Sequence, residues 1–360
     1  MNIDRRFQES LGVELPIIQA PMAGSSDGEL AIAVSEAGGL GSLPCAMLTP
    51  DQVRTSFQNI QSRSSRPVNL NFFCHREPTP DHVRELQWRE RLTHFYTELG
   101  VDASAPSAVP NRAPFNEAMC DVVVDLKPKV VSFHFGLPTQ SLLHRVRATG
   151  ARILSSATTV EEARWLEDQG CDAVIAQGSE AGGHRGMFLA TDAASQVGTL
   201  ALVPQIVDAV EIPVIAAGGI GDARGIVAAF ALGASAVQIG TAYLRCPECR
   251  TSAVHRKALE NAREDQMTIT NVITGRPARG IVNRIIREVG PMNASAPDFP
   301  RAATAIAPLR ARAEQNGSGD FSPLWAGQAA PMAREISAST LTKMLAEEAK
   351  QLTQRLGSAS

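Results

Sequence analysis

The sequence predicts an α/β protein whose main domain is a (β/α)8 barrel of the TIM type. Three observations support this fold class. Short runs rich in Val and Ile recur eight times along the chain, and amphipathic helical patterns separate them. Two glycine-rich turns also follow the seventh and eighth runs, where barrels of this type commonly bind phosphate.

The eight apolar runs are interpreted as strands that are buried on both faces. They lack the alternation of apolar and polar residues that marks a half-buried strand, as expected of a parallel sheet. Eight strands that alternate with helices favour a closed barrel over an open sheet. The predicted strands are residues 16–20, 39–43, 67–71, 130–133, 152–156, 173–176, 213–217 and 234–239.

Helical patterns occupy the connections between these strands. Two connections are longer than the rest: an insertion at about residues 76–123 follows the third strand, and residues 178–198 follow the sixth. Insertions after strands lie on the C-terminal face of a barrel, where active sites are assembled. The predicted helices in this part of the chain are residues 29–37, 142–149, 160–169, 200–209 and 223–232.

The barrel is expected to occupy residues 1–245, including the insertion. Residues 246–360 are expected to be mostly helical and to form a cap and a C-terminal helix. The predicted helices of this region are residues 252–263, 302–314 and 340–356. We expect the cap to cover the barrel mouth and the last helix to pack outside it.

Composition excludes several classes of function. The chain has 360 residues, of which 44% are hydrophobic and 20% charged, as in ordinary globular proteins. Its formal net charge of −3 gives no electrostatic footprint for nucleic-acid binding. No export signal is visible at the N-terminus, and no stretch approaches about 18 uninterrupted apolar residues. We therefore expect a cytoplasmic protein without nucleic-acid or membrane partners; its oligomeric state is left open.

The six cysteines are scattered along a large chain, so a disulfide scaffold is not expected. Only Cys246 and Cys249 have a suggestive spacing. A zinc ribbon would need a second such pair, and a thioredoxin-like role would need a different fold. We interpret the pair as part of a loop after a strand and expect no metal.

The turns GGIGD at 218–222 and GTA at 240–242 are candidate phosphate sites. Glycine allows close approach of the backbone to a ligand, and amides at a following helix start point toward an anion. The alternative is a pair of tight turns without a ligand. A dinucleotide fingerprint is absent, because no third glycine and no acidic residue follow at the required distances.

The loop QGSEAGGHRG at 177–186 presents His184 among four glycines on the predicted active face. Such a backbone can wrap closely around a flat or anionic ligand. An imidazole with an ordinary pKa near about 6.5 can accept a proton at neutral pH. His184 is therefore a candidate base. The isolated histidines, in contrast, are given ordinary structural roles: His82, His94, His144 and His255.

Three further segments can contribute to the mouth of the barrel. Ala20, Pro21 and Met22 close the first strand, where they suit packing against an apolar ring, although Pro21 could simply end the strand. The side chains of Asn69 and Asn71 face the same way on the third strand, and a ligand could satisfy their buried amides. His134 ends the fourth strand and could either line the site or cap the strand.

Taken together, four segments resemble the motifs of class I nitronate monooxygenases, formerly called 2-nitropropane dioxygenases. The late segment SPLWAGQ at 322–328 also resembles the C-terminal region of that family. The resemblance covers nearly the whole chain in order. The four segments are PIIQAPM at 16–22, VSFHFG at 131–136, GSEAGGHRG at 178–186 and IPVIAAGG at 212–219.

The resemblance implies an FMN-dependent enzyme that oxidises alkyl nitronates, and in some cases nitroalkanes or propionate 3-nitronate, with O₂. The products are a carbonyl compound and nitrite. His184 matches the family's catalytic histidine. Further matches lie around the flavin ring and at its phosphate, with Gln238 the loosest: Ala20, Pro21, Met22, Asn69, Gln177, Gly182, Gly183, Gly218, Gly219, Gln238, Gly240 and Thr241.

Two alternatives remain open on the sequence. Flavin-dependent enoyl-acyl-carrier-protein reductases share the GGH loop, the strand before Gly218 and the Gly-Thr turn, but reduce a C=C bond with NAD(P)H. The VSFHFG segment favours the nitronate enzyme. The second alternative is a barrel that binds a flavin or phosphate ligand without catalysis, and His184 in its glycine loop argues against it.

Overall fold

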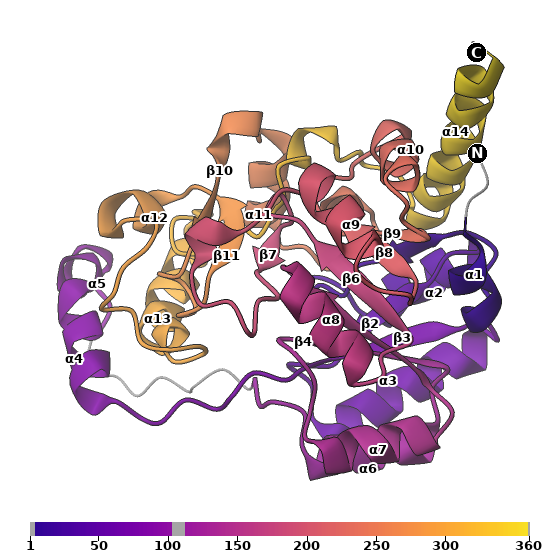
Figure 1. Ribbon diagram of the computed structural model, residues 1–360. Coiled ribbons are helices and arrows are strands. Elements are labelled where there is room, and N and C mark those ends of the chain that lie inside the picture. Colours follow the sequence, from indigo (N-terminus) through magenta and orange to yellow (C-terminus); the bar gives the residue numbers. More distant parts are fainter. Residues whose placement is uncertain (1–3, 103–111, 359–360) are drawn as a thin grey trace.

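Eight parallel strands form the centre of the molecule, and helices surround them (Figure 1). The computed structural model describes residues 4–102 and 112–358. The strand order is β1-β9-β8-β6-β5-β4-β3-β2. The strands are β1 (Ile17–Gln19), β2 (Gly41–Pro44), β3 (Val68–Phe73), β4 (Val130–His134), β5 (Arg152–Ala157), β6 (Ala173–Gln177), β8 (Val214–Ala217) and β9 (Ala236–Ile239).

The two ends of the sheet meet at β1 and β2. A parallel bridge joins Ile18 to Leu40, and the amide of Gln19 donates to the Leu40 carbonyl at 2.9 Å. Nearly every strand residue is buried, as expected when side chains fill the barrel on one face and helices cover the other. The predicted barrel and all eight of its strands are confirmed.

The outer helices follow the strands in the alternating order of a (β/α)8 barrel. The five helices predicted in the barrel are present within about two residues of their expected bounds, and α1, α3 and α6 were not predicted. Helix α3 begins with a capping box in which Thr49 and Gln52 satisfy each other's amides. The helices are α1 (Arg6–Leu11), α2 (Gly28–Glu36), α3 (Pro50–Arg63), α6 (Glu117–Leu126), α7 (Gln140–Ala148), α8 (Val160–Asp168), α9 (Thr199–Val207) and α10 (Ala223–Ala231).

A second hydrophobic cluster lies beside the barrel and draws on two distant parts of the chain. Helices α4 (His82–Arg91) and α5 (Thr93–Leu99), from the connection after β3, pack on α13 (Ala302–Gln315). Figure 1 shows these helices grouped with α12 (Arg284–Val289) on one side of the barrel. Trp88 is fully buried at the centre of this cluster, and its indole N–H donates to the Ala302 carbonyl at 3.3 Å.

A small antiparallel sheet joins this second cluster to the barrel. Its order is β10 (Met267–Thr270), β11 (Ala278–Ile281) and β7 (Gly183–His184). The sequence did not predict these strands, since β7 has only two residues and β10 and β11 have four each. The pairing is informative because it attaches the loop that carries His184 to the region after the barrel.

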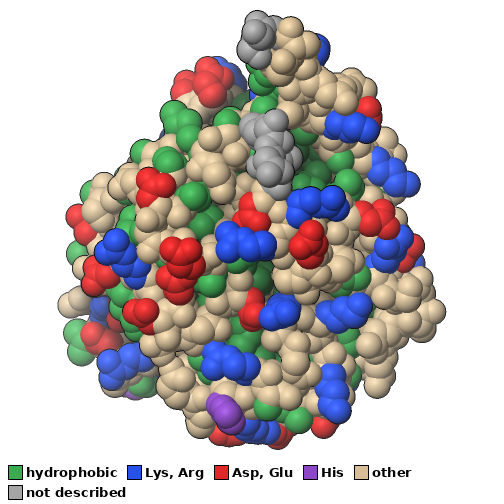
Figure 2. All heavy atoms as spheres, turned by 45° about the vertical axis from the view of Figure 1, so that its right-hand side comes forward, with side chains coloured by type: hydrophobic (Ala, Val, Ile, Leu, Met, Phe, Trp, Pro, Cys, Tyr) green, Lys and Arg blue, Asp and Glu red, His purple; other side chains and the backbone are tan. Residues whose placement is uncertain are grey.

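The remaining C-terminal elements lie close to the barrel. The segment after β9 contains η2 (Thr241–Arg245), α11 (Ala253–Glu260), η3 (Glu264–Gln266) and η4 (Ala330–Met332), and η1 (Ala193–Ser195) lies after β7. The last helix, α14 (Ala338–Ser358), packs on α2 and α10. In the described ranges, no helix has the length and apolar character needed to cross a membrane. On the face shown in Figure 2, acidic and basic side chains are interspersed.

Candidate functional site

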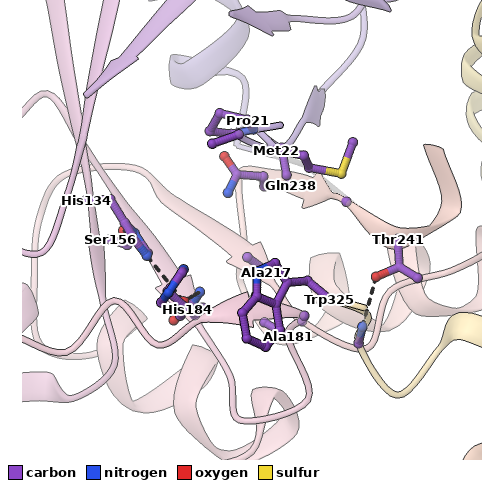
Figure 3. A pocket seen from close by; sticks show the side chains of 18 of the residues that line it. Pro21, Met22, His134, Ser156, Ala181, His184, Ala217, Gln238, Thr241 and Trp325 are labelled. Carbon is purple, nitrogen blue, oxygen red and sulfur yellow. Dashed lines mark hydrogen bonds between the residues drawn. The ribbon is translucent and has the colours of Figure 1, made fainter. Parts of the chain in front are cut away.

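A cavity opens at the C-terminal ends of the barrel strands, beneath the region that follows the barrel. Figure 3 shows His184 and Trp325 facing Pro21, Met22 and Gln238 across it. Loops after β1, β6, β8 and β9 supply most of the lining, together with strand ends and the late segment around Trp325. The cavity therefore has the location at which barrel enzymes assemble their active sites.

Buried hydrogen bonds fix the loop that carries His184. The His184 carbonyl accepts from Gln177 Nε2 at 3.1 Å and lies 3.2 Å from His134 Nε2. Arg185 is fully buried and donates to the carbonyls of Gln177 and Gly178, each at 2.8 Å. The loop also pairs with β11, where His184 is opposite Ala278. The imidazole thus projects from a backbone that is held on several sides.

The His184 imidazole is held by one of its two ring nitrogens. Nε2 lies 2.9 Å from Thr274 Oγ1, whereas no described residue forms a hydrogen bond with Nδ1. Burial lowers the pKa of His184 well below its ordinary value, and the positive charges of Arg112 and Arg276 lower it further. The ring is therefore neutral at physiological pH, and Nδ1 is available as a proton acceptor when Nε2 carries the hydrogen.

Aromatic rings surround His184. Its ring centroid lies 5.1 Å from Phe299 and 5.4 Å from Trp325, and Phe73 and Phe135 are also within ring-contact range. Phe135 has a backbone φ of 70°, a strained conformation for a non-glycine residue. These apolar rings lower the dielectric constant around the imidazole and favour its neutral form.

The two glycine turns lie elsewhere in the same cavity. Gly218 and Gly219 have φ values of 115° and 69°, which favour glycine. The amides of Gly219 and Thr241 donate to no other residue of the described chain. Thr241 Oγ1 accepts from the amide of Gly327 at 2.9 Å, so the late segment folds onto the second turn (Figure 3). Free amides in two adjacent turns can bind an anion such as a phosphate.

A buried acceptor lies near the end of the first strand. Gln238 Oε1 is buried without a hydrogen-bond partner, and its side chain borders the cavity beside Pro21 and Met22 (Figure 3). Buried polar groups in native proteins almost always have partners, so this atom indicates a missing donor. A ligand with an N–H group at its edge would satisfy it.

The structure brings together His184 and eleven of the twelve residues expected to bind the cofactor, all on the cavity wall. Asn69 is different. It is fully buried, its amide donates to Ser42 and Ser132 at 3.0 and 2.9 Å, and it does not line the cavity. Asn71, two residues further along the same face of β3, lines the cavity in its place.

Several lining residues were missed or left undecided by sequence analysis. His255 was given a structural role, yet it lines the cavity, and its Nε2 is buried without a partner. Trp325 and Arg112 also line it; Trp325 belongs to the SPLWAGQ segment but was not singled out, and Arg112 belongs to no local pattern that marks a site. His134 both lines the cavity and supports the His184 loop, with its Nδ1 2.5 Å from Ser156 Oγ.

Neither Cys246 nor Cys249 lines the cavity. Cys246 and Cys249 are buried free thiols in the turn after η2, and Cys249 Sγ donates to the Ser25 carbonyl at 2.8 Å. Burial raises the pKa of both thiols, to about 12 for Cys246. Within the ranges that the structure describes, no group of three or more His, Cys, Asp and Glu side chains could hold a metal ion.

Comparison with known families agrees with this arrangement. The family model for nitronate monooxygenase matches residues 5–348. This chain belongs to the nitronate monooxygenase family. It is 42% identical to a nitronate monooxygenase of Pseudomonas aeruginosa over 347 residues, which cover 95% of this chain and 98% of that protein. It is 36% identical to a probable nitronate monooxygenase of Bacillus subtilis over 347 residues, with coverages of 95% and 98%.

Solved structures extend the comparison. A nitroalkane oxidase from Streptomyces ansochromogenes has a TM-score of 0.89 and 38% identity, covering 98% of this chain and 99% of that one. FabK from Thermotoga maritima has a TM-score of 0.78 and 27% identity over the whole of both chains. The family resemblance drawn from the four sequence motifs is therefore confirmed, and similarity to the nitroalkane oxidase exceeds that to FabK.

Proposed function

We propose that this protein uses FMN to oxidise alkyl nitronates with O₂, yielding a carbonyl compound and nitrite. The observation that carries the proposal is one cavity that holds both His184 and the two glycine turns with free amides. Membership of the nitronate monooxygenase family supports nitronate oxidation, and the family is flavin-dependent in general. The two glycine turns and the absence of a dinucleotide fingerprint support the choice of FMN over other flavins.

The lining residues fit the parts of FMN. The free amides of Gly219 and Thr241 would hold its phosphate, and Gln238 Oε1 would accept from an N–H of the ring. Pro21 and Met22 would contact the ring through apolar atoms. FAD would require a site for a second phosphate and an adenosine, and the sequence has no dinucleotide fingerprint.

The protein's part in the reaction is to bind, orient and deprotonate. When bound, the flavin supplies the redox chemistry between the substrate and O₂. A nitronate is already an anion, so His184 has no proton to remove from it. A neutral nitroalkane must first lose its α-proton, and the neutral His184 imidazole would accept it at Nδ1, since Nε2 contacts Thr274. Thr274 fixes the ring, and the surrounding aromatic side chains keep water away.

Enoyl reduction with NAD(P)H is the second candidate, because the whole chain is also similar to FabK. The two candidates differ in their electron donor. We expect no NADH consumption with an enoyl thioester above the rate without the thioester. A thioester-dependent loss of NADH absorbance would favour the reductase instead.

Identification of the bound cofactor is the first test of the proposed chemistry, because the reaction depends on the flavin. The purified protein is expected to be yellow and to release FMN on acid treatment, as identified by chromatography against FMN and FAD standards. Release of FAD would contradict the assignment of the two glycine turns to a single terminal phosphate. Failure to bind FMN after reconstitution would contradict the assignment of the cofactor and therefore the proposed reaction.

A further inference from the structure

Arg112 places a positive charge on the wall of the candidate site, and the part of the chain that the structure describes supplies no counter-charge. Its side chain lines the cavity, and its Nε is buried without a hydrogen-bond partner. No acidic side chain of the described residues forms a salt bridge with it. Burial lowers its pKa to about 10, which still leaves the guanidinium charged at neutral pH.

Two other arginines near the site donate hydrogen bonds within the described chain. Arg185 donates to two carbonyls and to Gln196 Oε1, and these bonds hold the His184 loop in place. Arg276 does not line this cavity; it lies over the Phe135 ring at 4.0 Å and donates to the Met187 carbonyl, although its Nε is also buried without a partner. Among the described residues, Arg112 has only a distant ring contact, with its Cζ 5.6 Å from the Phe299 centroid. The N–H groups of Arg112 are therefore available to donate to a ligand.

Arg112 is half-buried, and partial removal of a cation from water without a counter-charge is costly, so an anion that binds beside it would offset that cost. Arg112 is also the charged group that contributes most to lowering the pKa of the His184 imidazole, so the guanidinium lies within electrostatic reach of the candidate base. An anion bound by Arg112 would thus lie near the reacting atoms. The planar guanidinium fork matches groups with two oxygens in one plane, such as nitronate and carboxylate.

We propose that Arg112 is a specificity-determining residue that binds a planar two-oxygen anion of the substrate. This inference rests on the proposed function for the identity of the substrate, but not for the binding of an anion. The anion has two possible sources. It is either the nitronate group itself or a carboxylate at the other end of the substrate, as in propionate 3-nitronate.

Anion binding is tested on the holoprotein by calorimetric titration with propionate, with neutral propionamide as the matched probe. Wild type is expected to bind propionate in preference to propionamide. Arg112→Gln should weaken propionate binding by about 10- to 100-fold, the usual value of a hydrogen bond to a charged group. Arg112→Lys keeps the charge but loses the fork, so it should lose less. Circular dichroism and flavin content verify folding.

Arg310→Gln is the matched control, because it removes a nearby positive charge that is paired with Glu314 and does not line the cavity. It is expected to bind propionate as wild type does. An equal loss in Arg310→Gln and Arg112→Gln would assign the effect to general electrostatics and overturn the proposal.

Steady-state kinetics distinguish the two sources of the anion. If Arg112 binds a carboxylate tail, Arg112→Gln should lower kcat/KM for propionate 3-nitronate about 10- to 100-fold and leave propyl-1-nitronate nearly unchanged. If it binds the nitronate group, both substrates should lose equally. Either result supports the proposal. Wild-type values for Arg112→Gln with propionate and both nitronates would overturn it. If wild type oxidises no nitronate, the proposed function fails, and the propionate titration alone decides the role of Arg112.

Discussion

His184 illustrates how the surroundings of a side chain decide its chemistry. An isolated imidazole is half-protonated near pH 6.5. In this cavity, burial and the charges of Arg112 and Arg276 all disfavour the protonated form. His75, His134 and His255 have pKa values that burial lowers to about 4, 3 and 4. The cavity wall therefore combines the neutral imidazoles of His134, His184 and His255 with the cationic Arg112, which suits an anionic or polarised substrate.

Replacing His184 with Asn tests its assignment as the base. Asn keeps a similar size and some hydrogen bonding, so flavin content should survive. Nitroalkane turnover should fall by about 10²- to 10⁴-fold, the usual contribution of a positioned general base, while preformed nitronate should lose much less. Oxygen uptake with each substrate provides the measurement. Equal losses on both would assign His184 to binding or to electrostatic stabilisation instead.

The lowered pKa of His184 predicts the pH dependence of nitroalkane oxidation. Only the neutral imidazole accepts a proton, and a lowered pKa keeps it neutral further into the acid range. The kcat/KM for a nitroalkane should therefore not change through ionisation of His184 above about pH 6.5, and should fall only at lower pH. A profile that rises through pH 6.5 to 7.5 in wild type, and is lost in His184→Asn, would contradict the lowered pKa.

At the scale of elements, the active-site loops owe their positions to contacts that are distant in sequence. The Gln177–Gly186 loop is held by β11 and by the buried Arg185, and the turn at Thr241 is covered by Gly327. The sequence allowed prediction of the strands and turns because Val/Ile runs and glycines are local signals. It did not allow prediction of β7, β10 and β11, whose pairing depends on the folded barrel rather than on a local pattern.

The same limit applies to the candidate site. Most of its expected residues could be found because they belong to motifs at strand ends. Trp325, His255 and Arg112 reach the cavity from segments outside the barrel, so their roles depend on tertiary packing. Asn69 was expected at the cavity because it alternates with Asn71. It lies deeper in the barrel instead, where its side-chain amide donates to the hydroxyls of Ser42 and Ser132.

Gly219→Asp tests the first glycine turn as a phosphate site. A Cβ at this position would meet the Glu180 Cβ at 3.2 Å, and the new carboxylate would add a negative charge to the turn and repel a phosphate, so the protein should lose flavin while remaining folded. Flavin content and circular dichroism, measured together, provide the readout. Gly100→Asp is the control: its φ of 61° imposes a similar backbone strain, but its Cβ would enter open space away from the cavity. Normal flavin occupancy in Gly219→Asp would place the phosphate elsewhere.

The whole molecule is built around more than one hydrophobic cluster. The barrel strands are covered by the helices that alternate with them. The cluster around Trp88 instead combines α4 and α5 with residues 272–321. The division into a barrel through residue 245 and a cap from residue 246 stays a prediction. The packing shows that helices α4 and α5 of the insertion after β3 contact α13 of the region after residue 245.

Trp88→Ala tests how strongly this second cluster supports the molecule. Removal of a fully buried Trp should destabilise the protein by about 3–5 kcal/mol. Leu86→Ala is the control on the same helix, since Leu86 is 58% exposed and should change stability by no more than about 0.5 kcal/mol. Chemical denaturation of both variants provides the comparison. A Trp88→Ala variant as stable as wild type would mean that the cluster contributes little to folding.

Oxygen consumption by the flavin-loaded wild type is the most direct test of nitronate oxidation. An oxygen electrode follows the oxygen concentration after addition of propyl-1-nitronate or propionate 3-nitronate, and nitrite is measured in the same samples. We predict that oxygen falls on addition of nitronate, without NADH, and that nitrite accumulates with it. Oxygen that stays constant with both nitronates, in a protein shown to contain FMN, would contradict the proposed function.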